Sequence, residues 1–392
     1  MKVISKHKYL LIKFLALIVF FEILIIIPKI FSSKIPLRDT YIACLNATKE
    51  SKEKGLCLRK LATSAIKNYS RDKIESEITT IANSAHIQWC HEFMHYAGWE
   101  LYRRTGSLYE AFTLASDKCD SAMYHGVVEE YINTTSDNYD IEDFVSSVVP
   151  NACEDGFSKR NLPIAMKGHC YHGLGHAFMF ITDNDLNQSL GYCDHVLGGQ
   201  EKSCYTGALM ENVQTKQVGR SGSHISKFSY DPKDPDYPCN KLKQKYKDYC
   251  YRYKGVSNFV LTNANVKQSM IECLKVTPAY QEECFWGVGS DIPGPHWSSH
   301  IAGEKCNEAL EVSPQAYKQC IAGAMAFLLQ FNLGSANEAV VFCDAIKEDY
   351  KPVCYSAAGN TLRGWTTSEE SIEEKCRHFE DPVVQDICLD PN

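Results

Sequence analysis

The sequence lacks the motifs that identify several large classes of enzyme. It contains no G-x-S-x-G nucleophile motif and no Walker A phosphate loop. Gly173-Leu-Gly175 begins a dinucleotide-binding pattern, but the third glycine is missing. Basic residues are not in excess either, because the formal net charge is −7. These absences argue against a serine hydrolase of the α/β type, nucleotide-dependent chemistry and nucleic-acid binding.

No two cysteines are close enough to form a C-x-x-C pair. This absence argues against zinc ribbons, thioredoxin-like redox sites and c-type haem attachment. The chain nevertheless has 18 cysteines, an even number, within an otherwise globular composition of 44% hydrophobic and 23% charged residues. Because disulfides persist outside the reducing cytoplasm, this cysteine usage predicts an exported protein.

One long hydrophobic run lies near the N-terminus. Residues 9–31 are long enough to cross a bilayer as a helix, although Lys13 and Glu22 interrupt them. Three lysines precede the run, as expected where an N-terminus stays in the cytoplasm. No A-x-A cleavage site follows, so the sequence favours an uncleaved signal anchor over a cleaved signal peptide. We therefore expect a single-pass membrane protein with the bulk of the chain extracytoplasmic.

The cysteines mark an internal repeat. The second cysteine of several copies is followed three positions later by glycine, as in Cys284-Phe-Trp-Gly. From Cys250 onward these second cysteines lie 34, 36, 34 and 34 residues apart. Such a period predicts two-helix repeats that stack into a solenoid. In period and architecture the repeat resembles tetratricopeptide and Sel1-type helical repeats.

The spacing of the cysteines also predicts how they pair, although sequence alone does not fix connectivity. In four copies the two cysteines are 11 positions apart, which allows one helical turn, a loop and entry into the next helix. The two sulfurs can then meet across a helical hairpin. Glycine after the second cysteine is expected to let neighbouring helices approach closely. The pairs predicted in this way are Cys44–Cys57, Cys153–Cys170, Cys193–Cys204, Cys239–Cys250, Cys273–Cys284, Cys306–Cys320, Cys343–Cys354 and Cys376–Cys388, and Cys90 and Cys119 are left for each other.

The segment His91-Glu92-Phe93-Met94-His95 is a complete H-E-x-x-H motif. Residues four apart share one face of a helix, so both histidines can bind one metal ion while Glu92 acts as a general base. With Gly98, the motif resembles the metzincin peptidase pattern, but Leu101 occupies the position of the third histidine ligand. A metzincin is therefore not predicted.

Two further pairs of metal-capable residues align with each other. Tyr124-His125-Gly126 and Tyr171-His172-Gly173 match residue for residue, and Glu129 and His176 each lie three positions after the glycine. Because equivalent helices of a solenoid lie side by side, we expect these pairs to converge on one centre. The predicted metal ligands are His91, His95, His125, Glu129, His172, His176 and Glu211, and the predicted catalytic residue is Glu92.

Mixed histidine and carboxylate ligation suits a divalent metal, Zn²⁺ or else Fe or Mn. Such a metal would lower the pKa of bound water toward about 7 and create a nucleophile. Two functions remain open. One is a metal-dependent hydrolase or non-haem oxidase acting on an unknown extracytoplasmic substrate or protein partner. The alternative is a non-catalytic solenoid that serves as a binding or scaffold module.

The predicted fold class is all-α, with disulfide-stapled helical-hairpin repeats of the α-solenoid type behind one N-terminal transmembrane helix. Its predicted parts are a cytoplasmic tail at 1–8, a transmembrane signal anchor at 9–31, a membrane-proximal helical or linker region at 32–86, a His/Glu-rich helical region with the candidate metal site at 87–214, a loop insertion at 215–238 and Cys-paired helical repeats at 239–392.

Overall fold

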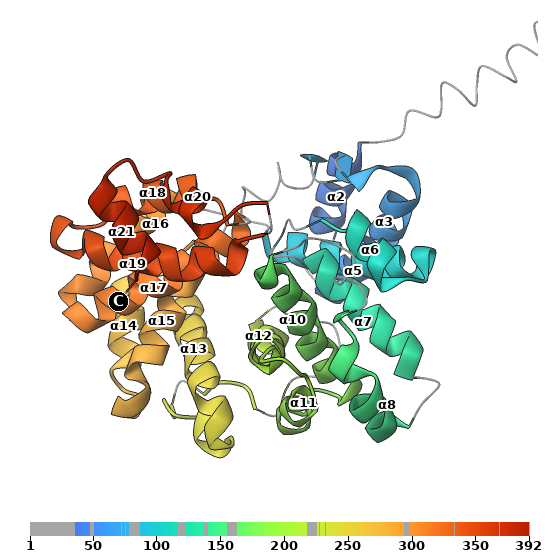
Figure 1. Ribbon diagram of the computed structural model, residues 1–392. Coiled ribbons are helices and arrows are strands. Elements are labelled where there is room, and N and C mark those ends of the chain that lie inside the picture. The colour runs from blue at the N-terminus through green and yellow to red at the C-terminus, as the bar shows by residue number, and fades with distance from the viewer. Residues whose placement is uncertain are drawn as a thin grey trace, which may run out of the picture.

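A computed structural model of the chain consists of helices, turns and loops throughout the residues it describes, which confirms the predicted all-α class (Figure 1). The predicted anchor at 9–31 lies outside the described residues. Of the helices that are described, none combines the length and apolar character needed to cross a membrane. The described residues are 36–391, without 48–50, 72, 75, 78–86, 117–118, 120–121, 137–139, 155–162, 218–225, 227, 232, 294–297, 333 and 368.

Long helices alternate with shorter ones along most of the chain. The long helices are α3 (Ser51–Asn68), α5 (Ile87–Thr105), α7 (Ala122–Ser136), α10 (Ile164–Ile181), α12 (Glu201–Gln217), α13 (Gln244–Leu261), α15 (Gln281–Asp291), α17 (Pro314–Phe331) and α19 (Lys351–Leu362). The shorter α-helices are α2 (Leu37–Asn46), α6 (Leu108–Leu114), α8 (Ile141–Ser147), α11 (Leu186–Cys193), α14 (Val266–Cys273), α16 (Ser299–Cys306), α18 (Ala336–Asp344), α20 (Ile372–Cys376) and α21 (Pro382–Leu389). Six 3₁₀ turns join them: η1 (Val149–Asn151), η2 (Cys239–Lys241), η3 (Pro278–Tyr280), η4 (Asn307–Glu311), η5 (Glu348–Tyr350) and η6 (Arg363–Trp365).

The unit formed by α14, η3 and α15 shows how the sequence builds one repeat. The side chain of Asn265 caps α14 by accepting a hydrogen bond from the backbone N–H of Gln268. The helix ends at Cys273, and Pro278 begins the 3₁₀ turn that leads into α15. Cys284 lies in the first turn of α15 and forms a disulfide with Cys273. The disulfide therefore links the end of the short helix to the start of the long one.

All nine predicted disulfides are present: the eight inferred from hairpin spacing and Cys90–Cys119, which was assigned because these two cysteines were left over. Each joins cysteines between 11 and 29 positions apart. Closing loops of this size stabilises a fold by roughly 2–4 kcal/mol per bridge in the chain-entropy view. A two-helix unit buries too little apolar surface to be stable alone, and the bridges together with stacking compensate for this.

Neighbouring long helices approach each other at glycines. A Cβ atom on Gly287 of α15 would lie 1.8 Å from the carbonyl oxygen of Arg252 in α13. A Cβ atom on Gly323 of α17 would lie 2.0 Å from the carbonyl oxygen of Trp286 in α15. No side chain fits at such distances, so the expected close approach is confirmed at these glycines. Gly173 is less tightly enclosed, since its nearest neighbour would be Val128 Cβ at 3.2 Å.

The helices form two stacks along the chain (Figure 1). In the first, α5, α7, α10 and α12 pack one against the next, and in the second, α13, α15, α17, α19 and α21 do the same. The contact between α12 and α13 is less extensive. Helix α12 continues to Gln217, so residues 215–217 of the predicted loop at 215–238 are helical, and the described residues 226, 228–231 and 233–238 form turns and loop. The second stack returns to the first where η6 contacts α10. Two segments about 200 positions apart in the sequence, η6 and the helix α10 that carries His172 and His176, thus meet in the folded chain.

We expect Gly287→Ala to destabilise the fold by about 1–3 kcal/mol, because α13 and α15 must separate to make room for the new methyl group. Denaturant unfolding under non-reducing conditions measures this change. Gly191→Ala is the matched control, since a Cβ atom on this glycine of α11 would meet nothing within 4 Å. The control should be neutral or stabilising by up to about 1 kcal/mol, because alanine favours helix more than glycine does. Equal stability of the two variants would contradict the close-packing argument.

Candidate metal centre

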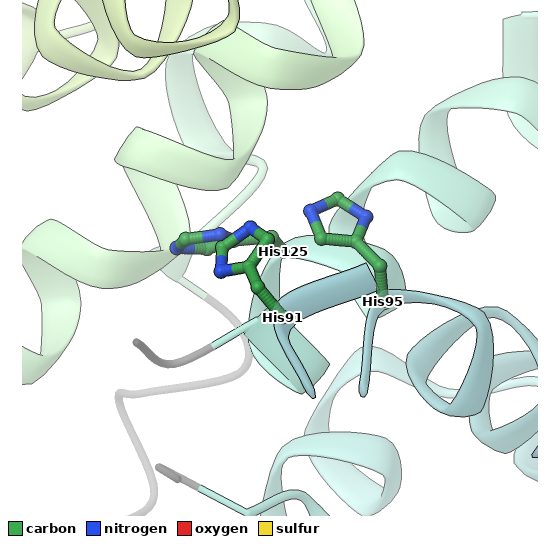
Figure 2. A group of neighbouring side chains, drawn as sticks. All are labelled: His91, His95 and His125. Carbon is green, nitrogen blue, oxygen red and sulfur yellow. The ribbon is translucent and has the colours of Figure 1, made fainter. Parts of the chain in front are cut away.

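Five histidines from three neighbouring helices gather in one cluster. His91 and His95 come from α5, His125 from α7, and His172 and His176 from α10. They form two groups of three, His91–His95–His125 and His125–His172–His176, and in each group the candidate ligand atoms lie within 4.8 Å of one another. Figure 2 shows the first group, in which the α5 histidines lie beside His125. The cluster therefore has the composition and spacing of a metal site, with His125 common to both groups.

Backbone packing at glycines holds the histidine-bearing turns together. A Cβ atom on Gly126 of α7 would lie 2.1 Å from the carbonyl oxygen of His95, so α7 contacts α5 at that turn. A Cβ atom on Gly173 would lie 3.3 Å from the Cα atom of His125, which places α10 against the same turn of α7. The backbone segments that carry the histidines next to these glycines are consequently in contact, and the imidazoles converge.

The Nδ1 atoms of three of these histidines donate hydrogen bonds to oxygens that can only accept. Carbonyl and ionised carboxylate oxygens have no proton to give, so each of these Nδ1 atoms carries the proton and each neutral ring has its lone pair on Nε2. The three bonds run from His91 to the Cys119 carbonyl at 3.1 Å, from His95 to Glu129 at 3.0 Å and from His176 to Glu211 at 2.7 Å. Trp99 Nε1 donates to the same oxygen of Glu129 as His95 does, at 2.7 Å, as expected for a carboxylate.

His172 also carries its proton on Nδ1, because of a hydrogen bond to a hydroxyl group. Its Nδ1 lies 2.9 Å from Thr206 Oγ1, and that hydroxyl donates its only proton to the carbonyl of Ser203 at 2.7 Å. Nδ1 of His172 is therefore the donor to Thr206, and Nε2 carries the lone pair. Nε2 of His172 lies 3.1 Å from Nε2 of His176. Two imidazole nitrogens on one tetrahedral zinc ion are roughly 3.3 Å apart, so this pair has the spacing of two ligands of one ion.

Buried ring nitrogens without a hydrogen-bond partner among the described residues include Nε2 of His95 and Nδ1 of His125. A buried polar atom without a partner destabilises a fold by about 1–3 kcal/mol. Coordination to a metal ion would remove that penalty. The donor set therefore fits a metal better than it fits a purely structural polar core.

Burial keeps His125 and His172 of the cluster uncharged. It holds the pKa of His125 well below its ordinary value of 6.5, and the neighbouring imidazoles of His176 and His172 lower it further. Burial and then His176 lower the pKa of His172 in the same way. The pKa of His169, one turn before His172 on α10, falls to about 4 through burial alone. Because metals bind neutral imidazole, these rings are in the ligand-competent form at neutral pH.

The structure brings all five predicted histidines together and places two predicted carboxylates behind them. Glu129 and Glu211 accept hydrogen bonds from Nδ1 atoms, on the side of each ring opposite Nε2. Glu92 lies elsewhere on α5. Its carboxylate accepts a hydrogen bond from Tyr96 at 2.5 Å and faces Gly55 of α3, where a Cβ atom would lie 3.1 Å from it. Glu92 as a catalytic base stays a prediction from the motif.

A cavity of about 300 Å³ lies beside the cluster, and His172 is part of its wall. Ser203 and Thr206 of α12, Gln330 of α17 and Trp365 of η6 contribute other parts of the wall. Sequence reasoning did not identify this cavity. Of these four residues, only Thr206 stands out in the sequence, because it aligns with His125 and His172 in the repeat. The other three carry no motif, and they meet His172 only in the folded chain.

No family model matches the chain, and comparisons with curated proteins and with solved structures likewise found no match. The fold and the site define the class by themselves. The chain is an all-helical, disulfide-linked protein with histidine groups that could hold a metal ion.

We expect the metal-free protein to lose stability as the pH falls below about 6.5. In the native state the pKa values of His125, His172 and His169 are lowered, whereas in the unfolded chain they return to about 6.5. Between these values the unfolded state binds more protons, so acid favours unfolding by up to roughly 1.4 kcal/mol per pH unit for each histidine. Stability is fully present above pH 6.5. Denaturant unfolding in EDTA from pH 8 to pH 5 measures this slope.

His195 provides the matched control for the pH experiment because its side chain is exposed. The His195→Gln variant should show the same pH slope as the unmodified chain. A stability that is flat between pH 7 and pH 5 would contradict the neutral, buried state of the cluster.

Proposed function

We propose that the chain is an exported metalloenzyme whose histidine cluster holds one divalent transition-metal ion and acts as a hydrolase. The observation that carries this proposal is the orientation of the rings. Four imidazoles are held at Nδ1 by a carbonyl, two carboxylates and a hydroxyl, which directs their Nε2 atoms toward the other rings, and the Nε2 atoms of His172 and His176 are the proposed ligands among them. Ligating histidines in metalloproteins are fixed in this way by groups behind them, which set the tautomer and the ring orientation.

The donor set favours zinc. Imidazole nitrogen suits Zn, Cu, Fe and Ni, whereas Mn, Mg and Ca prefer oxygen ligands. We assign Glu129 and Glu211 to orienting His95 and His176, so the ligands themselves are neutral nitrogens. A three-histidine set with an open position is a known arrangement for catalytic zinc. One ion per chain is expected, because two dications in a cluster of neutral ligands would face strong mutual repulsion.

The group His125–His172–His176 is the proposed position of the ion. The Nε2 atoms of His172 and His176, both on α10, have the spacing of two ligands of one ion, and His172 adjoins the cavity. A metal bound there would supply the chemistry of a water molecule with lowered pKa. The chain's own contribution is to hold the rings and to bury the centre next to the cavity that His172 lines. We give Glu92 no role in this proposal, since its carboxylate faces α3.

The purified protein with its disulfides intact should contain about one zinc ion per chain by elemental analysis. His125→Ala and His172→Ala should each lower zinc affinity by more than about 100-fold, since each removes a ligand. Glu211→Gln should lower it by about 10–100-fold, because His176 loses the group that orients it. His195→Ala, at an exposed histidine outside the cluster, should leave zinc content unchanged.

Each result of this series supports or overturns a specific part of the proposal. No stoichiometric metal in the unmodified chain would overturn the metal centre and the hydrolase with it. Full zinc content in His172→Ala, with loss in His91→Ala, would place the ion in the other three-histidine group. A zinc content of two per chain would contradict the single-ion argument.

A non-catalytic binding or scaffold role is the second candidate function. It is supported by the second stack, because none of the described residues of α13 to α21 contributes to a metal-capable group. Those repeats continue the solenoid for about as long as the histidine-bearing part. A chain without bound metal but with intact disulfides would favour this role over the enzyme.

The nine disulfides indicate an oxidising, extracytoplasmic environment. We propose in addition that residues 9–31 anchor the chain in the membrane, as their apolar character suggests. The full-length chain should remain in the membrane fraction after an alkaline carbonate wash, and deletion of residues 1–35 should abolish that retention. Release of a chain whose N-terminal sequence begins after residue 31 would identify a cleaved signal peptide instead and overturn the anchor.

A further inference from the structure

We propose that the cavity beside His172 binds a single neutral sugar ring, and that such a saccharide is the substrate class of the enzyme. The location of the ligand next to a metal rests on the proposed function. The binding of the ligand to the cavity does not, since that depends on the cavity wall alone.

The cavity is assembled from segments that lie far apart in the sequence. His169 and His172 of α10 form one wall, and Ser203 and Thr206 of α12 form the next. The remaining wall comes from α17 and η6 in the second stack. The cavity therefore exists only where the C-terminal repeats return to α10. Ligand pockets commonly lie at such junctions between packed parts of a chain.

The polar part of the wall consists of neutral hydrogen-bonding groups. Gln200 and Gln330 provide amides, while Ser203 and Thr206 provide hydroxyls. The described residues that line the cavity include no aspartate, glutamate, lysine or arginine. A charged ligand would lose its hydration there without gaining a protein counter-charge. The wall thus selects a neutral ligand that both donates and accepts several hydrogen bonds.

The apolar part of the wall contains one large aromatic ring. Trp365 packs edge-on against His169, with ring centroids 5.9 Å apart and planes at 73°. Gly334 also packs against this side chain, since a Cβ atom there would lie 2.3 Å from Trp365 Cβ. The side chain is 4% exposed, so it adds a small apolar area to the wall and loses little side-chain freedom on binding.

A sugar ring combines the two properties that this wall selects. Its C–H groups are apolar and suit the apolar lining of Ile164, Ala165, Ala326 and the exposed part of Trp365, and its hydroxyls are neutral donors and acceptors. A purely apolar ligand would leave the glutamine and serine groups without partners, which weakens binding. The volume of about 300 Å³ is at the small end for ligand cavities, so one ring fits better than an oligosaccharide.

The cavity reaches the histidine cluster through two residues. His172 lines it directly, and so does Thr206, whose hydroxyl accepts the hydrogen bond from His172 Nδ1. A ligand in the cavity therefore lies beside the imidazole that we propose as a metal ligand. A paramagnetic ion in the centre would consequently broaden the NMR signals of a bound sugar.

The test is saturation-transfer NMR of the full chain with methyl glycosides of glucose, galactose, mannose and N-acetylglucosamine. At least one should bind, and methyl glucuronide and uridine should bind at least about tenfold more weakly. Gln330→Leu should weaken sugar binding by at least tenfold while leaving zinc content unchanged. Gln319→Leu is the matched control, because it lies three turns earlier on the same helix and outside the cavity wall. Trp365→Phe should weaken binding less than Gln330→Leu, since it retains an aromatic ring.

The outcomes separate this inference from the proposed function. Stoichiometric zinc with no binding of any neutral glycoside would overturn the sugar site and leave the metal centre intact. Sugar binding that survives EDTA, in a chain that holds no zinc, would keep the sugar site and overturn the enzyme. Stronger binding of methyl glucuronide would overturn the assignment to neutral sugars, and stronger binding of uridine would overturn the assignment to a single sugar ring. With Co²⁺ in place of zinc, absence of line broadening for a bound sugar would place the ligand away from the centre.

Discussion

The close contact of helix backbones at glycines is the constraint on which the rest of this structure depends. At Gly126 the backbone of α7 lies against His95 of α5, and at Gly207 the backbone of α12 lies against His172 of α10, where a Cβ atom would be 1.9 Å from the carbonyl oxygen. Helices separated by larger side chains would hold their histidines several ångströms farther apart. The same packing thus stabilises the solenoid and forms the cluster.

The buried carboxylates acquire their role from this packing. A carboxylate among apolar side chains is strongly disfavoured unless it accepts hydrogen bonds, and Glu129 does so from His95 and Trp99. Each such bond also fixes the proton of its histidine on Nδ1 and leaves Nε2 toward the other rings. Polar groups that would otherwise destabilise the interior therefore orient the ligands. Burial, hydrogen bonding and metal competence are consequences of one arrangement.

The second stack contributes to the site even though it carries none of the five histidines. The 3₁₀ turn η6, which follows α19 in this stack, meets α10, and Trp365 forms part of the cavity wall beside His172. A solenoid in which each unit contacts only its neighbours would leave this side of α10 exposed. The contact between distant repeats adds a wall to the site in an otherwise linear assembly.

The sequence by itself predicted the helical class, eight hairpin cysteine pairs and the five histidines, because all of these follow from local spacing, and the ninth pair, Cys90–Cys119, followed by elimination. Cysteines about a dozen residues apart meet across a hairpin, and histidines four apart share a helix face. Only the tertiary structure decided that Glu129 and Glu211 lie behind the rings and that Glu92 faces α3. A shift of one position on a helix turns a side chain by about 100°, and contacts between helices determine which direction meets a partner. The cavity with Trp365 was likewise beyond local reasoning, since it requires two segments separated by nearly half the chain to meet.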